Sequence, residues 1–62
     1  MRATVEPIPG GLRVVDENGR AIAYLYGRET AVAARQAGVP TLAEAERFAH
    51  IFARAINEAT DL

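Results

Sequence analysis

The sequence predicts an α+β domain, with a small antiparallel two- or three-stranded sheet packed on one C-terminal amphipathic helix. Three observations predict this fold: alternating apolar residues around Asn18-Gly19, a capping box from Thr41 to Glu44, and apolar residues at helical spacing after it. The 62 residues are enough for a single domain, 1–62, that buries only about 60% of its unfolded surface. We therefore expect the isolated domain to have low stability, and we expect a partner or a second copy to stabilise it.

The hairpin is the strongest local signal. Asn18 and Gly19 suit the central positions of a type I′ turn, which requires positive φ at both. This turn places Glu17 opposite Arg20 and fixes each pair counted outward from it. The expected pairs are Asp16 with Ala21, Val15 with Ile22, Val14 with Ala23, Arg13 with Tyr24, and Leu12 with Leu25. One face then carries Leu12, Val14, Ala21, Ala23 and Leu25, and the other carries Arg13, Val15, Ile22, Tyr24 and Tyr26.

Two further segments flank the hairpin with weaker signals. Residues 5–8 could add a first strand, but Pro7 and Pro9 each lack a backbone donor and confine it to a sheet edge. Residues 29–37 are rich in alanine and precede Gly38, which suits the position after a helix end. A short helix between the hairpin and the C-terminal helix is therefore expected.

The C-terminal helix is predicted over residues 42–59. Thr41 and Glu44 can each bond the other's backbone N–H, which is the capping box of a helix start. At 100° per residue, one apolar arc of about 160° forms along the helix. It comprises Leu42, Ala45, Phe48, Ala49, Phe52, Ala53, Ala55, Ile56 and Ala59. This arc is expected to pack on the sheet face that carries Leu12, Val14 and Leu25, which leaves the second face bare.

The residues for catalysis or metal binding are scarce, so we expect neither an enzyme nor a cofactor. The chain has no cysteine and no serine, and its hydroxyl groups belong to four threonines and two tyrosines. His50 is the only histidine, and without further ligands at metal-binding spacing it is expected to be solvated on the helix surface. So short a chain is also not expected to enclose the ~300 Å³ that a small-molecule substrate needs.

Charge and hydropathy predict a cytoplasmic protein. The net charge is −1, and all seven basic residues are arginines spread from Arg2 to Arg54 rather than clustered. The N-terminal residues include no apolar core of a signal peptide, and no stretch approaches the ~20 apolar residues of a membrane span.

The bare sheet face carries our main functional hypothesis. Contiguous exposed apolar residues beside a basic residue are typical of an interface, and tyrosine and arginine are enriched at binding surfaces. The interface predicted from the register comprises Arg13, Val15, Ile22, Tyr24 and Tyr26, with Ile51 as an exposed apolar residue on the helix. The hypothesis is a non-enzymatic interaction module: a homodimer, an adaptor, or an inhibitor of a larger protein, such as one from a phage or mobile element. The alternative is that the N-terminal segment or residues 29–38 fold over this face.

A second hypothesis is a nucleic-acid-binding domain. The expected fold is similar to the three-strand-plus-helix DNA-binding domains of the integrase-arm kind, in which the sheet face opposite the helix enters a groove. Arg13, Arg20 and Arg28 would supply its phosphate contacts. They are fewer than such domains use, and the net charge gives no general attraction to phosphate.

A family resemblance rests on two segments, residues 11–26 and residues 41–49. They resemble the hairpin F-x-V-x-D-x-x-G-x-x-L-A-Y-V-Y and the helix L-T-x-x-E-A-x-R-I-A of short uncharacterised alphaproteobacterial proteins common in rhizobia. The resemblance extends over about residues 11–54 and implies the hairpin-plus-helix fold without an activity. Members carry arginine where this chain has Val15 and asparagine where it has His50.

Overall fold

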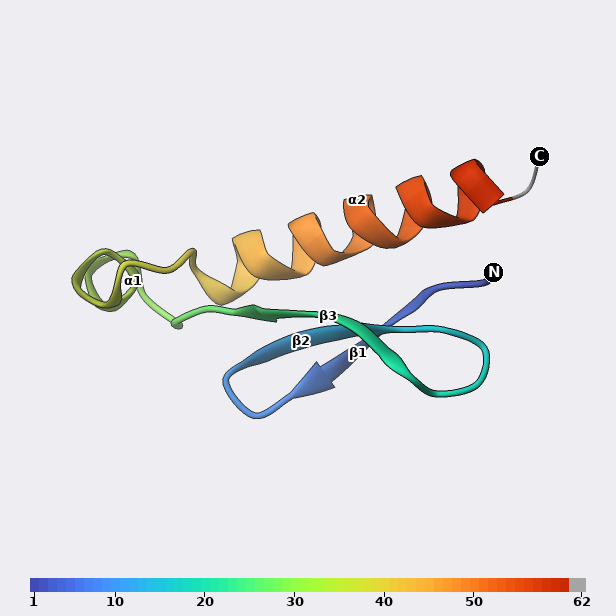
Figure 1. Cartoon of the computed structure of the whole chain (residues 1–62). Helices are drawn as coiled ribbons and strands as arrows, with labels where there is room; N and C mark the ends of the chain where they lie inside the picture. The colour runs from blue at the N-terminus through green and yellow to red at the C-terminus, as the bar shows by residue number, and fades with distance from the viewer. Residues whose placement is uncertain (61–62) are drawn as a thin grey trace.

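A computed structural model, which describes residues 1–60, shows one antiparallel sheet with a long helix across one face (Figure 1). The elements in chain order are β1 (Thr4–Ile8), β2 (Gly11–Val15), β3 (Ala21–Tyr26), α1 (Ala31–Ala37) and α2 (Leu42–Thr60). The strands lie in the order β1-β2-β3, so β2 is central. The α+β fold is confirmed, with both the third strand and the short helix present.

β1 accommodates its proline because of where the backbone points. Gly27 donates its N–H to the carbonyl of Gly10 over 3.1 Å, which makes this a bonded pair between the ends of β2 and β3. Backbone groups alternate in direction along a strand, so those of Leu12 also point to β3. Pro7 pairs with Leu12 on the other side and therefore directs its nitrogen away from the sheet. The missing donor faces the outer edge of β1, where no strand of the described chain pairs.

The turn differs from the predicted type I′ turn. Gly19 has a φ of 81°, but among residues 1–60 only glycines have a positive φ, so Asn18 cannot occupy its predicted position. Asp16 instead donates its N–H to Arg20 and accepts from Gly19, both over 3.0 Å, which closes a three-residue loop. The Asp16 carboxylate also accepts the backbone N–H groups of Asn18 and Arg20, at 2.9 and 3.0 Å. This local side-chain bonding favours the longer turn.

A bulge restores the predicted register beyond the turn. Val15 pairs with Ala21 rather than with Ile22, and Asp16 bonds Arg20 rather than pairing with Ala21. The ladder shifts by one residue between Val14 and Val15, and Ile22 is the unpaired residue. The predicted pairs Val14 with Ala23, Arg13 with Tyr24, and Leu12 with Leu25 are confirmed. The loop has one residue more than predicted, which shifts the pairing by one residue, and the bulge shifts it back.

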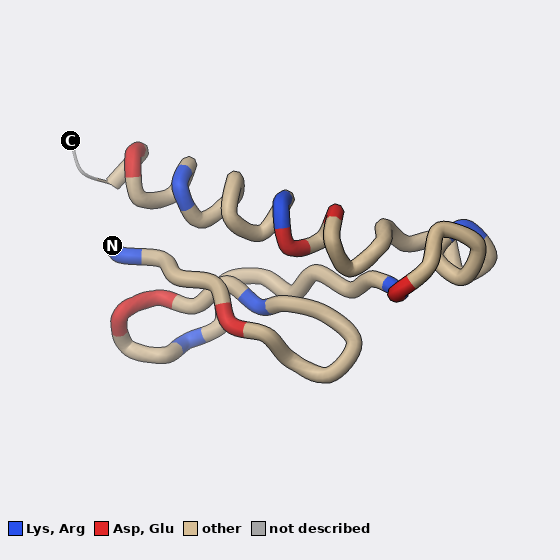
Figure 2. Tube along the Cα trace, turned by 180° about the vertical axis from the view of Figure 1, so that it is seen from behind, with Lys and Arg blue, Asp and Glu red and all other residues tan. Residues whose placement is uncertain are grey.

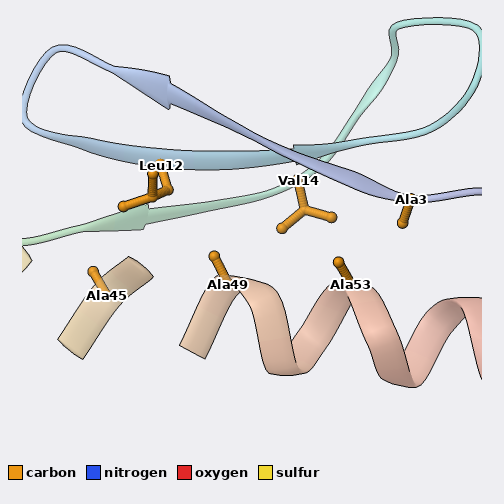
Figure 3. Packing of buried hydrophobic residues seen from close by; sticks show 6 residues of the cluster. All are labelled: Ala3, Leu12, Val14, Ala45, Ala49 and Ala53. Atoms are coloured by element: carbon orange, nitrogen blue, oxygen red, sulfur yellow. The ribbon is translucent and has the colours of Figure 1, made fainter. Parts of the chain in front are cut away.

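The core between sheet and helix is thin because the helix meets the sheet through alanines. We call Ala45, Ala49 and Ala53 the alanine stripe; all three are buried, and Figure 3 shows them facing Leu12, Val14 and Ala3. Their small side chains let α2 lie close to the strands. Phe48 and Phe52 were predicted to lie in the buried arc, but they are 45% and 41% exposed. A helix this close to the sheet has no room beneath it for a phenyl ring.

Three local devices position α2. The predicted capping box is confirmed: Thr41 donates its N–H to Glu44 Oε1 over 3.0 Å, and Glu44 returns its N–H to Thr41 Oγ1 over 3.1 Å. Arg28 donates to the Pro40 carbonyl and accepts from Leu42, which ties the end of β3 to the start of α2. At the far end of α2, Asn57 bonds both the N–H and the carbonyl of Ala3.

Candidate interaction surface

The second sheet face is open. Tyr24, Tyr26 and Ile22, together called the tyrosine face, are 54%, 51% and 37% exposed. The two tyrosine rings stack with centroids 6.3 Å apart and planes 6° from parallel. Neither proposed cover lies on this face: the N-terminal segment forms β1 within the sheet, and Figure 1 shows α1 beyond the end of the strands. Within residues 1–60, α2 is the only helix packed on the sheet, and it covers the opposite face.

Val15 was expected to be exposed on this face, and that expectation is wrong. Its side chain is only 3% exposed. It lies in the central strand between Thr4 of β1 and Ala21 of β3, and it is not part of the core beneath α2. Val15 therefore stabilises the sheet and is not available to a partner.

Arg13 is on this side of the sheet as expected, but its charge is already paired. Its guanidinium bonds the carboxylate of Glu6 on β1, with the Nη2–Oε1 distance at 2.7 Å and the Nε–Oε1 distance at 2.8 Å. Glu6, through this hydrogen bond and its charge, raises the pKa of Arg13. Arg13 is half-buried beside Tyr24, its cross-strand partner. It can border an apolar interface without bringing an unpaired charge to it.

A second exposed apolar group lies on α2. Ile51 is 55% exposed, as the sequence predicts, and Phe48 and Phe52 lie one turn apart beside it. We call these three residues the phenylalanine flank. The opposite flank of α2 faces β1, because His50 lines a groove with Thr4, and Glu46 lines another with Pro7. The phenylalanine flank therefore lies on the β3 side of the helix.

This arrangement brings the two apolar groups to the same strand. The tyrosine face belongs to β3 itself, and the phenylalanine flank lies on its side of α2. Sequence reasoning missed this relationship because it placed Phe48 and Phe52 in one buried arc with the alanines. The signal that could have revealed it is the segregation of size: alanines recur every four residues, and the large side chains stand to one side of them.

The arginines proposed for nucleic-acid contact are dispersed and engaged. Arg20 Nε bonds the buried carboxylate of Asp16 over 3.1 Å, and Arg28 donates to the Gly27 carbonyl. The pKa of Asp16 is lowered, first by the backbone N–H of Arg20 and also by that of Asn18. Figure 2 shows acidic and basic residues interleaved along the described chain rather than gathered by sign.

A groove of about 450 Å³ lies between β1 and α2. This volume is larger than the ~300 Å³ that the chain was not expected to enclose. The groove is open to solvent, however, and does not enclose a ligand-sized space. Its lining includes Arg2, Thr4, His50, Arg54 and Glu58. His50 is exposed there, and within residues 1–60 no three side chains of His, Cys, Asp or Glu gather as metal ligands would.

Within residues 1–60, neither helix combines the length and the apolar content that passage through a membrane requires. Comparison with protein families, curated proteins and solved structures finds no match to this chain. The resemblance to rhizobial hairpin-plus-helix proteins stays a prediction.

Proposed function

We propose that this protein is a non-enzymatic interaction module that binds another protein chain at the β3 side of its sheet. The observation that carries the proposal is the distribution of large apolar side chains. The core beneath α2 is mostly alanine, with Leu12 and Val14 as its large buried side chains. The tyrosine face and the phenylalanine flank stay exposed. A chain that leaves more large apolar side chains outside than inside has a surface suited to association.

The energy of burying the exposed aromatic side chains favours the participation of both groups. Aromatic side chains present ~150–250 Å² each, so the half-exposed Tyr24 and Tyr26 leave about 200 Å², worth ~5 kcal/mol at ~25 cal/mol per Å². Phe48 and Phe52 add a similar amount. Association costs about 4–15 kcal/mol before any net affinity appears. The tyrosine face alone would barely meet the lower limit, whereas the two groups together can exceed it.

The test replaces an exposed apolar residue on the proposed surface and one away from it. Tyr24→Asp, and Tyr24→Asp with Ile22→Asp, place charge on the tyrosine face. Val32→Asp on α1 is the matched control, because Val32 is also exposed but lies outside the sheet. Solution mass and circular dichroism across a dilution series, and binding to any purified partner, are compared. The Tyr24 variants should lose association while Val32→Asp keeps it; unchanged mass and binding in all three would contradict the proposal.

A further inference from the structure

The outer edge of β3 has a defined set of unused backbone groups. β3 ends the sheet, and within residues 1–60 no strand pairs beyond it. The bond from Gly27 to Gly10 sets the alternation, so the N–H and C=O groups of Ala23 and Leu25 point to β2. Those of Tyr24 and Tyr26 point outward. An added strand would therefore meet the backbones of the two tyrosines.

The two edges of the sheet differ in their protection against such addition. β1 carries Pro7 at an outward position and the charged Glu6, both of which discourage strand pairing. β3 has no proline, glycine or charge from Ala21 to Tyr26. Its bulge at Ile22 limits regular pairing to Ala23–Tyr26, so one register is favoured over its neighbours.

We infer that the occupant of this edge is a second copy of the same chain, paired antiparallel about a twofold axis at Leu25. This inference rests on the proposed function and identifies its partner. In this register Tyr24 of one copy lies opposite Tyr26 of the other, and each tyrosine backbone bonds its counterpart. The two sheets become continuous, and the stacked rings of Tyr24 and Tyr26 extend into a ladder across both copies.

The helices support this geometry. α2 lies mainly over β2, so the two copies of α2 would lie about three strand spacings apart, or ~14 Å at ~4.8 Å per strand. Helices in direct contact lie ~8–10 Å apart. The gap needs large side chains from both helices, and Phe48 and Phe52 project from the flank that faces it. The inference therefore explains why α2 has alanines on the side that faces the sheet and phenylalanines on the side that would face the second copy.

The surface area and the charge also fit a second copy. The four half-exposed aromatic side chains, of ~150–250 Å² each, supply on the order of 400 Å². That is about half of the ~800 Å² that each partner of a stable complex buries, and the strand backbone and interface rim add to it. A twofold pairing places each residue against the same surface on its copy. It needs no complementary charge, and β3 has no charges to repel one another.

The test blocks the outward N–H without altering any side chain. A 62-residue chain can be made by chemical synthesis, with N-methylation of Tyr24 in one sample and of Val5 in another. Val5 is the control, because its N–H points outward from the other sheet edge. Sedimentation should give a dimer for the unmodified and Val5-methylated chains and a monomer for the Tyr24-methylated chain. A monomeric unmodified chain at millimolar concentration, or a dimer after Tyr24 methylation, would overturn the inference.

Amide hydrogen exchange on the unmodified chain provides a second readout that needs no variant. The Tyr24 and Tyr26 amides should be protected at high concentration and lose at least tenfold of their protection on dilution, while Val5 exchanges quickly throughout. Unprotected tyrosine amides in the concentrated sample would also overturn it. A dimer that Tyr24→Asp breaks but Tyr24 methylation does not would retain the proposed function and reject only the edge pairing. An unchanged dimer in both would reject the two together.

Discussion

α2 places small apolar residues against the sheet and large apolar residues on one exposed flank. The alanine stripe is buried against the sheet, and the phenylalanine flank, on the neighbouring side of the same turns, is exposed. In an ordinary amphipathic helix the large apolar residues would fill the core and alanine would be neutral. Here the small residues set the distance between helix and sheet, and Phe48 and Phe52 stay 45% and 41% exposed. Apolar character alone therefore does not identify the core of so small a domain.

The largest expected effect comes from enlarging the alanine stripe. Ala49→Leu adds a side chain where Ala49 is fully buried against the sheet, and such overpacking costs about 1–3 kcal/mol. A domain of this size has only roughly 3–9 kcal/mol of stability in total. Urea denaturation should show a clearly lower midpoint than the wild-type chain. Ala43→Leu, at an exposed position of α2, is the control and should leave the midpoint nearly unchanged.

The second-largest effect should come from the two hydrogen bonds between Asn57 and Ala3, here called the clamp. Asn57→Ala leaves the partly buried N–H and carbonyl of Ala3 without their side-chain partner, at a cost of about 1–3 kcal/mol. Thermal unfolding should shift down, and the amide of Ala3 should exchange faster. Glu58→Ala, beside it on the exposed surface, should change neither. An unaltered Ala3 exchange rate would show that the clamp does not hold β1 to α2.

Acid should weaken the fold at two carboxylates that accept backbone N–H groups, Glu44 at the start of α2 and Asp16 at the turn. The pKa of Glu44 is lowered by the Thr41 N–H, and that of Asp16 chiefly by the Arg20 N–H. A depressed pKa contributes stability above the ordinary value of about 4, and this contribution is lost as pH falls through the lowered pKa. Urea midpoints should therefore be level from pH 7 to about 5 and then fall. Asp16→Asn should flatten part of that fall, and an equally steep fall in this variant would rule out Asp16 as a cause.

The phenylalanine flank should matter less than the alanine stripe to the isolated fold. Phe52→Ser removes a ring that is 41% exposed and should lower the unfolding free energy of the monomer by about 1 kcal/mol, less than Ala49→Leu. Association, followed by sedimentation, should weaken in the same variant. Arg54→Ser on the opposite flank is the control for both measurements. A loss of stability at high dilution as large as that of Ala49→Leu would show that the flank belongs to the core.

The smallest expected effect concerns nucleic acid. Arg13 and Arg20 are paired with carboxylates, so binding to duplex DNA should be weak even at low salt. Fluorescence anisotropy from about 50 to 200 mM salt would reveal phosphate contacts as a steep loss of affinity. Tight binding at low salt that Arg13→Gln abolishes would favour the nucleic-acid hypothesis over the interaction module.

The sequence predicted the fold class, the capping box and the central strand pairs, because each depends on neighbouring residues or on strict alternation. It missed the turn because the Asn18-Gly19 pair was considered without the Asp16 side chain, which bonds the backbone across the loop. The resulting bulge moved Ile22 out of its predicted pair with Val15.

The candidate surface was harder to predict than the fold. Tyr24, Tyr26 and Ile51 are exposed as expected, since alternation and helical spacing decide which way they point. Val15 is buried in the central strand, and its place there depends on whether β1 pairs at all. The exposure of Phe48 and Phe52 depends on the distance between helix and sheet, which is a property of the packed layers rather than of any local pattern.

The junction between β3 and α2 makes α1 a separable part of the chain. Arg28 bonds Pro40 and Leu42 across this junction, so the segment 29–40 begins and ends at the same place, next to the sheet and the start of α2. Gly27 permits this approach, because a side chain there would come within 2.9 Å of the Thr41 and Leu42 backbones. The helix within this excursion has its own caps at Thr30 and Gly38 and packs on no strand. Evolution or protein engineering can therefore lengthen, exchange or graft onto this excursion while the sheet and the long helix keep their arrangement.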